Sequence, residues 1–246
     1  MRIILIPGLW LDGSAWDAVL PGLRAAGHDP VAITLPGQGG RDGDGEAPAT
    51  LDEQLDAILA AIDAGGTGKT GETSEAGEAS GDPVLVVGHS AASTLAWLAA
   101  DRRPERVARV AMVGGMPQAD GAAYAPFFEP ADGVVAFPGW EAFEGPDSDD
   151  LTPEHREAFA AASHTVPETV VTGIVRYTDA RRHAVPVVMV CPEYSPEDAK
   201  AWLDAGEIPE LTPAQHVSYA DIDSGHWPMF SAPDALAQLL ASLAYR

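Results

Sequence analysis

Residues 84–87 are four consecutive apolar residues, and they lead directly into Gly88, His89 and Ser90, after which small residues follow (VLVVGHSAAS). A short apolar run that ends at a glycine is typical of a buried strand, and the alanines beyond it favour a helix. A serine between the two would lie on a sharp turn, with its hydroxyl above the carboxyl edge of a sheet. This stretch therefore favours a fold in which buried strands alternate with helices.

The rest of the chain repeats this alternation of Val/Ile-rich runs and amphipathic Ala/Leu-rich segments. The pattern predicts an α/β fold with βαβ units around a mainly parallel sheet. The expected strands are residues 2–7, 30–35, 84–88, 107–113, 186–191 and 216–222, and the expected helices are 16–26, 51–64, 91–100, 153–163, 196–205 and 233–244. At 246 residues, of which 46% are hydrophobic, the chain can bury a full core, so we expect residues 1–246 to form one domain.

Two stretches interrupt the alternation. Residues 65–82 contain Gly, Ser, Thr and Glu without an apolar anchor, which predicts a flexible surface loop. The piece GGTGKT within it is a poor phosphate-binding loop, because Asp63 stands where the first glycine is required and the piece follows a helix. Residues 114–185 are rich in Pro, Gly and aromatic residues and lie between two expected strands, which predicts an inserted lid.

The charge balance narrows the classes of partner. With 37 acidic and 14 basic residues, the formal net charge of −23 repels nucleic acids and anionic membranes. The single cysteine, Cys191, cannot form an intramolecular disulfide, and the apolar run before Pro7 is too short for a signal peptide or a membrane span. We therefore expect a cytoplasmic protein with a small-molecule substrate, no nucleic acid or membrane partner, and an oligomeric state that the sequence leaves open.

At the serine turn the chain resembles the α/β-hydrolase superfamily, and it is most similar to the small esterase and hydroxynitrile-lyase-like branch. The stretches that carry the resemblance span nearly the whole chain: LIPGLWLDGSAWDAVLPGL, VAITLPGQG, VLVVGHSAAS, the expected lid, and DIDSGHWPMFSAPDAL. A mild departure is Ala92, where the usual motif has a second glycine. The resemblance implies a single α/β-hydrolase domain and a catalytic order of serine, acid and histidine.

Ser90 is accordingly the expected nucleophile and His226 the expected base, since His226 follows the last expected strand in DSGHWPMF. The acid is less clear, because the register of the usual turn places Ser195 at its position. Glu193 is the preferred candidate, Asp120 is an alternative, and a serine–histidine dyad without an acid is another.

The resemblance also implies an oxyanion hole made of two backbone amides. The amide after the nucleophile, of Ala91, is expected to be one donor, and Leu9 in the turn PGLW the other, with Trp10 as its alternative. Six residues are expected to contact substrate: Trp10, His89, Phe128, Trp140, His164 and Trp227. The aromatic residues of the expected lid could line the pocket, but they could equally pack as the core of the lid itself: Tyr124, Phe127, Phe128, Phe137 and Trp140.

The favoured function is hydrolysis of a small, largely apolar ester, lactone or thioester through an acyl-enzyme on Ser90. Two alternatives keep the same fold: a lyase or cyclase that forms no acyl-enzyme, or a binder of small ligands without turnover. A cyanohydrin lyase is disfavoured, because Trp227 occupies the position where such relatives carry a lysine. No cofactor is expected and no metal site, since no metal-ligand spacing or dinucleotide motif is present.

Overall fold

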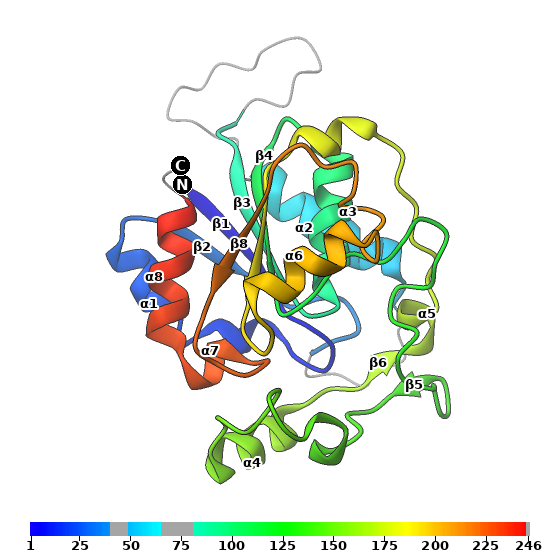
Figure 1. The fold of residues 1–246 in the computed structure, drawn as a ribbon. Helices are drawn as coiled ribbons and strands as arrows, with labels where there is room; N and C mark the ends of the chain where they lie inside the picture. Colours follow the sequence, from blue (N-terminus) through cyan, green and yellow to red (C-terminus); the bar gives the residue numbers. More distant parts are fainter. Residues whose placement is uncertain (40–48, 65–80, 245–246) are drawn as a thin grey trace.

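The protein is built on a six-stranded sheet, seen here in a computed structural model that describes residues 1–39, 49–64 and 81–244 (Figure 1). The strand order is β2-β1-β3-β4-β7-β8, and every neighbouring pair is parallel. This confirms the predicted α/β fold class. Except for its last two residues, the segment 65–82, with its GGTGKT stretch, lies outside the described residues.

The strands of the main sheet are β1 (Arg2–Ile6), β2 (Asp29–Ala32), β3 (Val84–His89), β4 (Val107–Val113), β7 (Val187–Cys191) and β8 (Val217–Asp221). The helices around it are α1 (Leu20–Ala25), α2 (Leu51–Asp63), α3 (Ala92–Arg102), α6 (Pro196–Asp204), α7 (Pro228–Ser231) and α8 (Pro233–Leu243), with a 3-10 turn at Gly13–Trp16.

Helices cover both faces of the sheet and divide the core into two clusters. In Figure 1, α1 and α8 lie on one face, and α2, α3 and α6 lie on the other. Side chains of β1 alternate between the clusters: Ile4 and Ile6 join the cluster that contains α2 and α3, whereas Ile3 and Leu5 join the one that contains α8. Strands buried on both faces need apolar residues at every position, which explains the continuous apolar runs.

Several elements are shorter than predicted, and prolines explain two of the differences. A helix over 16–26 would need an N–H at position 21, but Pro21 has none, so α1 begins at Leu20 and places Pro21 in its first turn. The strand predicted over 30–35 ends at Ala32, which pairs with Leu5, because β1 itself ends just before Pro7.

The residues between β4 and β7, numbered 114–186, form what we call the insertion. It contains a small antiparallel pair, β5 (Val134–Val135) with β6 (Val166–Pro167), and four short helical pieces: Trp140–Phe143, α4 (Pro153–Ala162), α5 (Glu168–Val171) and Ala180–Ala184. Figure 1 shows β5, β6 and α4 beyond the carboxyl ends of the strands, where sites of such folds are built.

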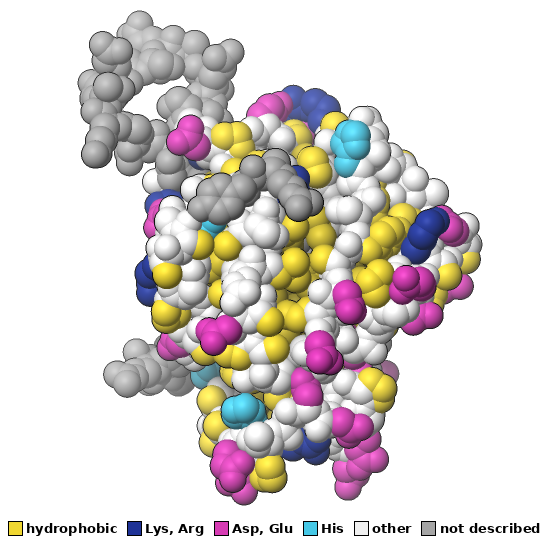
Figure 2. All heavy atoms as spheres, turned by 60° about the vertical axis from the view of Figure 1, so that its left-hand side comes forward, with side chains coloured by type: hydrophobic (Ala, Val, Ile, Leu, Met, Phe, Trp, Pro, Cys, Tyr) yellow, Lys and Arg dark blue, Asp and Glu magenta, His cyan; other side chains and the backbone are white. Residues whose placement is uncertain are grey.

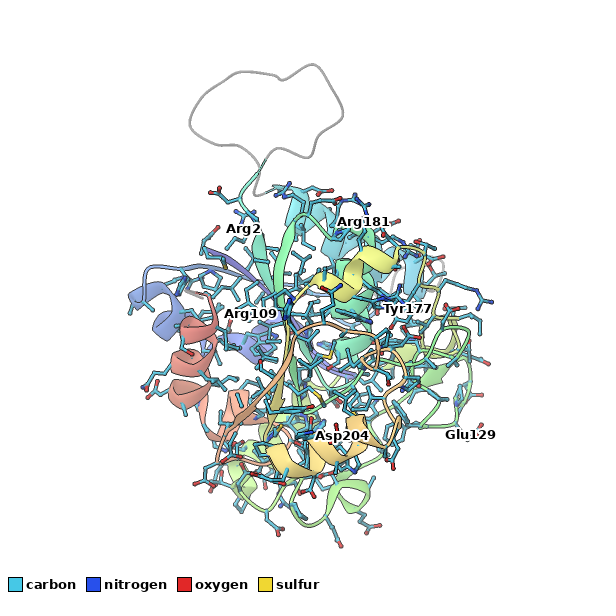
Figure 3. All side chains as sticks on the ribbon, turned by 45° about the horizontal axis from the view of Figure 1, so that its top comes forward. Arg2, Arg109, Glu129, Tyr177, Arg181 and Asp204 are labelled. Carbon is cyan, nitrogen blue, oxygen red and sulfur yellow. The ribbon has the colours of Figure 1, made fainter. Side chains whose placement is uncertain are left out.

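The last part of the insertion is tied to α3 by a buried charge cluster. Asp101, whose side chain is fully buried, accepts hydrogen bonds from the backbone N–H groups of Thr178 and Asp179 and pairs with Arg182 at 3.2 Å. Figure 3 shows Tyr177 and Arg181 on this side of the molecule.

In the described part of the chain, no helix is long and apolar enough to cross a membrane.

Candidate active site

Ser90 occupies a strained turn between β3 and α3. Its φ is 55°, a left-handed conformation that is uncommon for any residue other than glycine. The turn is held by the N–H of Ser90, which donates to the carbonyl of Val113 at 2.8 Å, and by the carbonyl of Ser90, which accepts from the N–H of Ser93 at 3.0 Å. Strain that neighbouring hydrogen bonds maintain is common where a side chain must be presented to a substrate.

The imidazole of His226 links the Ser90 hydroxyl to a carboxylate. Its Nε2 lies 2.9 Å from the Oγ of Ser90, and its Nδ1 lies 2.7 Å from Oε1 of Glu193. The side chains of His226 and Glu193 are only 14% and 13% exposed, so water screens their contact weakly. A carboxylate on Nδ1 keeps the proton there and leaves Nε2 free to accept one from serine.

The local sequence explains why Glu193, rather than Ser195, contacts the histidine. Ser195 caps the N-terminus of α6 in a capping box with Asp198, so its hydroxyl is engaged with the helix. Glu193 lies in the three-residue interval between the end of β7 at Cys191 and this cap. The alternative acid, Asp120, lies elsewhere: it is exposed, and its carboxylate accepts the N–H of Tyr177 at 3.0 Å.

His89 is buried directly beside this group. Its Nε2 lies 2.8 Å from the backbone carbonyl of His226, which can only accept, so Nε2 carries the proton. Burial, with a smaller contribution from the neighbouring His226, lowers the pKa of His89 to about 3. His89 is therefore a neutral donor that holds the backbone of His226.

A second carboxyl group, that of Asp147, lies near the histidine. Burial raises its pKa; the charge of His226 opposes this rise, and the charge of Glu193 adds to it. The backbone carbonyl of Asp147 also accepts the N–H of His226 at 2.8 Å. The insertion thus contributes directly to the surroundings of His226.

The turn after β1 lies against Ser90. A side chain at Gly8 would bring its Cβ within 3.1 Å of the Cβ of Ser90 and 2.8 Å of Nδ1 of His89, so only glycine fits. The backbone N–H groups of Leu9, Trp10 and Ala91 have no hydrogen-bond acceptor among residues 1–39, 49–64 and 81–244. These amides are available to a substrate oxygen.

Gln38 holds this turn in place. Its side chain is fully buried, and its Nε2 donates to the carbonyls of Gly8 at 2.9 Å and Leu11 at 3.2 Å. Gln54 in turn donates to Oε1 of Gln38 at 3.1 Å. Gln38 gives no signal in the sequence, because a lone polar residue in LPGQG has the appearance of an ordinary loop residue.

A cavity of about 40 Å³ adjoins Ser90 and His226. It is lined by Leu9, Trp10, His89, Ser90, Ala91, Phe127, Phe128, Phe143, His226 and Trp227. Aromatic rings form most of this wall, and Trp10 contacts Phe128 edge to face, with the ring centroids 4.9 Å apart. The lining contains no lysine or arginine, so it suits an uncharged group.

Of the six residues predicted to contact substrate, Trp10, His89, Phe128 and Trp227 line the cavity, but Trp140 and His164 do not. Trp140 packs behind Trp227, with ring centroids 5.2 Å apart, and its Nε1 donates to the carbonyl of Arg156. His164 instead anchors the insertion: its backbone N–H donates to the carbonyl of Trp10, and its Nε2 lies 3.1 Å from Asp12. Neither residue therefore reaches the cavity lining in this structure.

Phe143 is a lining residue that the sequence did not single out among the aromatics of the insertion. Its ring also contacts Trp227, at a centroid distance of 5.1 Å. No local signal separates it from Phe137 or Trp140, since only the path of the insertion decides which ring reaches the cavity.

In the described part of the chain, no group of three or more His, Cys, Asp or Glu side chains could hold a metal ion.

The fold and this geometry define a class of protein: parallel α/β proteins with a Ser–His–Glu array at the carboxyl edge of the sheet. Residues 3–239 match the family model described as the alpha/beta hydrolase family. The chain therefore belongs to the α/β hydrolase family.

Three relatives illustrate the similarity. Esterase PIR7B from Oryza sativa subsp. japonica is 29% identical over 112 residues, which cover 46% of this chain and 37% of that esterase, so the match spans little more than a third of the relative's length. Among solved structures, an extracellular alpha/beta-hydrolase from a Paenibacillus species has a TM-score of 0.73 at 15% identity and full coverage of both chains. A pyrethroid hydrolase from Sphingobium faniae has a TM-score of 0.66 at 20% identity, over 99% of this chain and 97% of the other. At these identities the structural likeness shows the fold.

Proposed function

We propose that this protein is a serine hydrolase of the esterase type, which cleaves a small, largely apolar ester, lactone or thioester. One observation carries the proposal: the imidazole of His226 lies within hydrogen-bond distance of both the Ser90 hydroxyl and the Glu193 carboxylate. That arrangement is what acyl transfer through a serine requires. The relatives described as an esterase and a pyrethroid hydrolase support the same reaction class.

In the first half of the reaction, Nε2 of His226 accepts the hydroxyl proton of Ser90 as Oγ attacks the substrate carbonyl carbon. Glu193 stabilises the imidazolium that forms. The bond from the carbonyl carbon to the leaving group then breaks, and the leaving alcohol or thiol takes the proton from His226. In the second half, water attacks the acyl-Ser90 ester with His226 as base, which releases the acid and restores Ser90.

The negative charge on the carbonyl oxygen would be held by the amides of Ala91 and of Leu9 or Trp10. Each donor of this kind contributes roughly 3–4 kcal/mol to the stabilisation of the transition state. Gln38 supports this role, because it fixes the carbonyls of Gly8 and Leu11 on either side of the two candidate amides.

The cavity limits the substrate. A volume of about 40 Å³ exceeds the roughly 10–15 Å³ that one water molecule needs in a cavity, so the cavity suits a small acyl group rather than a long chain. The remainder of the substrate would extend past Phe127, which is 57% exposed. In the proposed reaction, the insertion acts as a lid over the site.

The charge of the site favours neutral substrates. Glu193 and Asp147 lie beside His226, and the same insertion carries further exposed acidic residues: Glu141, Glu144, Asp149, Asp150, Glu154 and Glu157. In Figure 2, acidic side chains gather on the lower part of the face shown, where the insertion lies. An ester that carries its own carboxylate would be repelled.

The contact between Glu193 and His226 also favours acyl transfer over a lyase or cyclase, because the carboxylate stabilises the imidazolium that forms when His226 takes the proton of Ser90. The test is hydrolysis of p-nitrophenyl acetate by the wild type, by Ser90→Ala, and by Ser242→Ala as a control on α8. We expect Ser90→Ala to lose hydrolysis and labelling by a fluorophosphonate, while the control keeps both. A wild-type protein whose Ser90 is not labelled, or a Ser90→Ala variant with full turnover, would overturn the proposal.

A further inference from the structure

The acidic stretch of the insertion, GPDSDDL at residues 145–151, contacts the turn that carries His226. Oδ2 of Asp150 accepts the backbone N–H of Gly225 at 2.7 Å and lies 3.2 Å from the hydroxyl of Ser224. The next N–H in the chain, that of His226, donates to the carbonyl of Asp147 at 2.8 Å. Two consecutive amides of the histidine turn are therefore bound by one loop of the insertion.

Gly225 makes this contact close. A Cβ at position 225 would lie 2.5 Å from the carbonyl oxygen of Asp147 and nearer still to Asp150. Any larger residue would push the two loops apart, and with them the amide of His226. The close contact of Asp147 and Asp150 with the backbone at position 225 therefore requires glycine there.

The acidic loop is itself anchored to the cavity wall. Ser148 is fully buried, and its hydroxyl donates to the carbonyl of Phe143 at 2.7 Å. Phe143 lines the cavity beside Ser90. The loop therefore connects the wall that meets the substrate to the turn that holds the base.

From these contacts we infer that Asp150 is a positioning residue, which fixes His226 in its reactive orientation by accepting hydrogen bonds from Gly225 and Ser224. The inference rests on the proposed function, since it assigns Asp150 a role in the Ser90–His226 chemistry. Asp150 does not line the cavity, so it acts on turnover and not on substrate binding. A small displacement of a catalytic group is enough to slow a reaction on the order of a hundredfold.

The experiment compares three variants with the wild type: Asp150→Ala removes the acceptor, Asp150→Asn keeps an acceptor oxygen but removes the charge, and Asp149→Ala is the control. Asp149 is the adjacent exposed aspartate, and its side chain has no hydrogen bond or ion pair among the described residues, so it matches the loss of charge. Kinetics with p-nitrophenyl acetate separate kcat from KM, and the pH–rate profile reports electrostatic effects on His226.

We expect Asp150→Ala to lower kcat about ten- to a hundredfold with KM nearly unchanged, because the base is displaced while the cavity is intact. Asp150→Asn should retain kcat within about threefold, since its amide oxygen still accepts from Gly225. Asp149→Ala should match the wild type, and the acidic limb of the pH–rate profile should stay in place in every variant.

Three results would overturn the inference: equal kcat for Asp150→Ala and Asp149→Ala, equal losses for Asp150→Ala and Asp150→Asn, or a loss in Asp150→Ala that appears in KM. The first two would assign the loop no role or a role through charge alone. Fluorophosphonate labelling of Ser90 in the same samples distinguishes failure of this inference from failure of the proposed function. If the wild type is labelled and Asp150→Ala keeps its kcat, only the role of Asp150 is contradicted.

Discussion

Nε2 of His226 lies 2.9 Å from Oγ of Ser90 although the two residues are 136 positions apart in the chain. The contact exists because β3 and β8 are parallel strands of one sheet, so the loops after them meet at the same edge. Glu193 joins them from the end of β7, which lies next to β8 in the sheet.

Glu193 provides the first prediction. Glu193→Gln removes the charge that stabilises the imidazolium of His226, and we expect kcat for p-nitrophenyl acetate to fall on the order of a thousand- to ten-thousandfold. Glu197→Gln, on the exposed face of α6, is the matched control and should keep full activity. Steady-state kinetics at pH 7 and circular dichroism make the comparison, and a Glu193→Gln variant as active as its control would show that Ser90 and His226 work as a dyad.

The sheet could be predicted from the sequence because its signals are local. Apolar runs such as residues 84–87 mark strands wherever they pack, and all six predicted strands are present in the structure. The observed ends of β1 and α1 differ from the predicted ones for equally local reasons. A proline has no N–H, so Pro7 ends the hydrogen-bonded strand and Pro21 lies in the first turn of the helix.

Long-range contacts could not be predicted in the same way. The choice between Glu193 and Asp120 depended on where two loops end in space, and the paths of Trp140 and His164 depended on the packing of the insertion. The roles of Gln38 and Asp150 arise from hydrogen bonds to backbone groups of distant turns, which leave no pattern in the sequence.

Gln38 provides the second prediction. Gln38→Met leaves the carbonyls of Gly8 and Leu11 buried without a donor, and each loss of this kind costs about 1–3 kcal/mol. We expect the free energy of unfolding to fall by about 2–4 kcal/mol and kcat to fall as well, because the turn with the candidate oxyanion amides loosens. Urea unfolding and ester kinetics test both effects against Gln238→Met, an exposed change on α8, and a variant that loses stability while kcat stays intact would exclude a role for Gln38 in the site.

The third prediction concerns pH and His89. Its pKa is about 3 in the folded state against 6.5 when unfolded, so below pH 6.5 the unfolded chain binds a proton that the folded chain refuses. The wild type therefore loses about 1.4 kcal/mol of stability per pH unit as the pH falls below 6.5, a loss that His89→Gln avoids.

His89→Gln retains an N–H donor near the carbonyl of His226, so the two proteins differ mainly in whether residue 89 can be protonated. Urea unfolding at pH 7 and pH 5 should show the stability difference between the two proteins changing by about 2 kcal/mol in favour of the variant at pH 5. Parallel pH dependences would mean that His89 can be protonated in the folded protein.

Phe143 provides the fourth prediction, on specificity. Phe143→Ala removes an aromatic wall of the cavity, and we expect kcat/KM for p-nitrophenyl hexanoate to rise relative to that for the acetate, by about tenfold or more. Phe159→Ala is the control: Phe159 belongs to the same aromatic cluster but does not line the cavity. It should lose about 3–5 kcal/mol of stability without a change in preference, and an equal shift in both variants would place the specificity elsewhere.

The formation of an acyl group on Ser90 is the step that separates a serine hydrolase from the alternative functions. Wild-type protein mixed with p-nitrophenyl acetate, quenched in acid within milliseconds and digested, should yield the peptide that contains Ser90 in acetylated form, whereas His226→Ala should yield it unmodified. Steady turnover of the ester by the wild type, with the Ser90 peptide unmodified at every time point and another residue acetylated, would contradict the account.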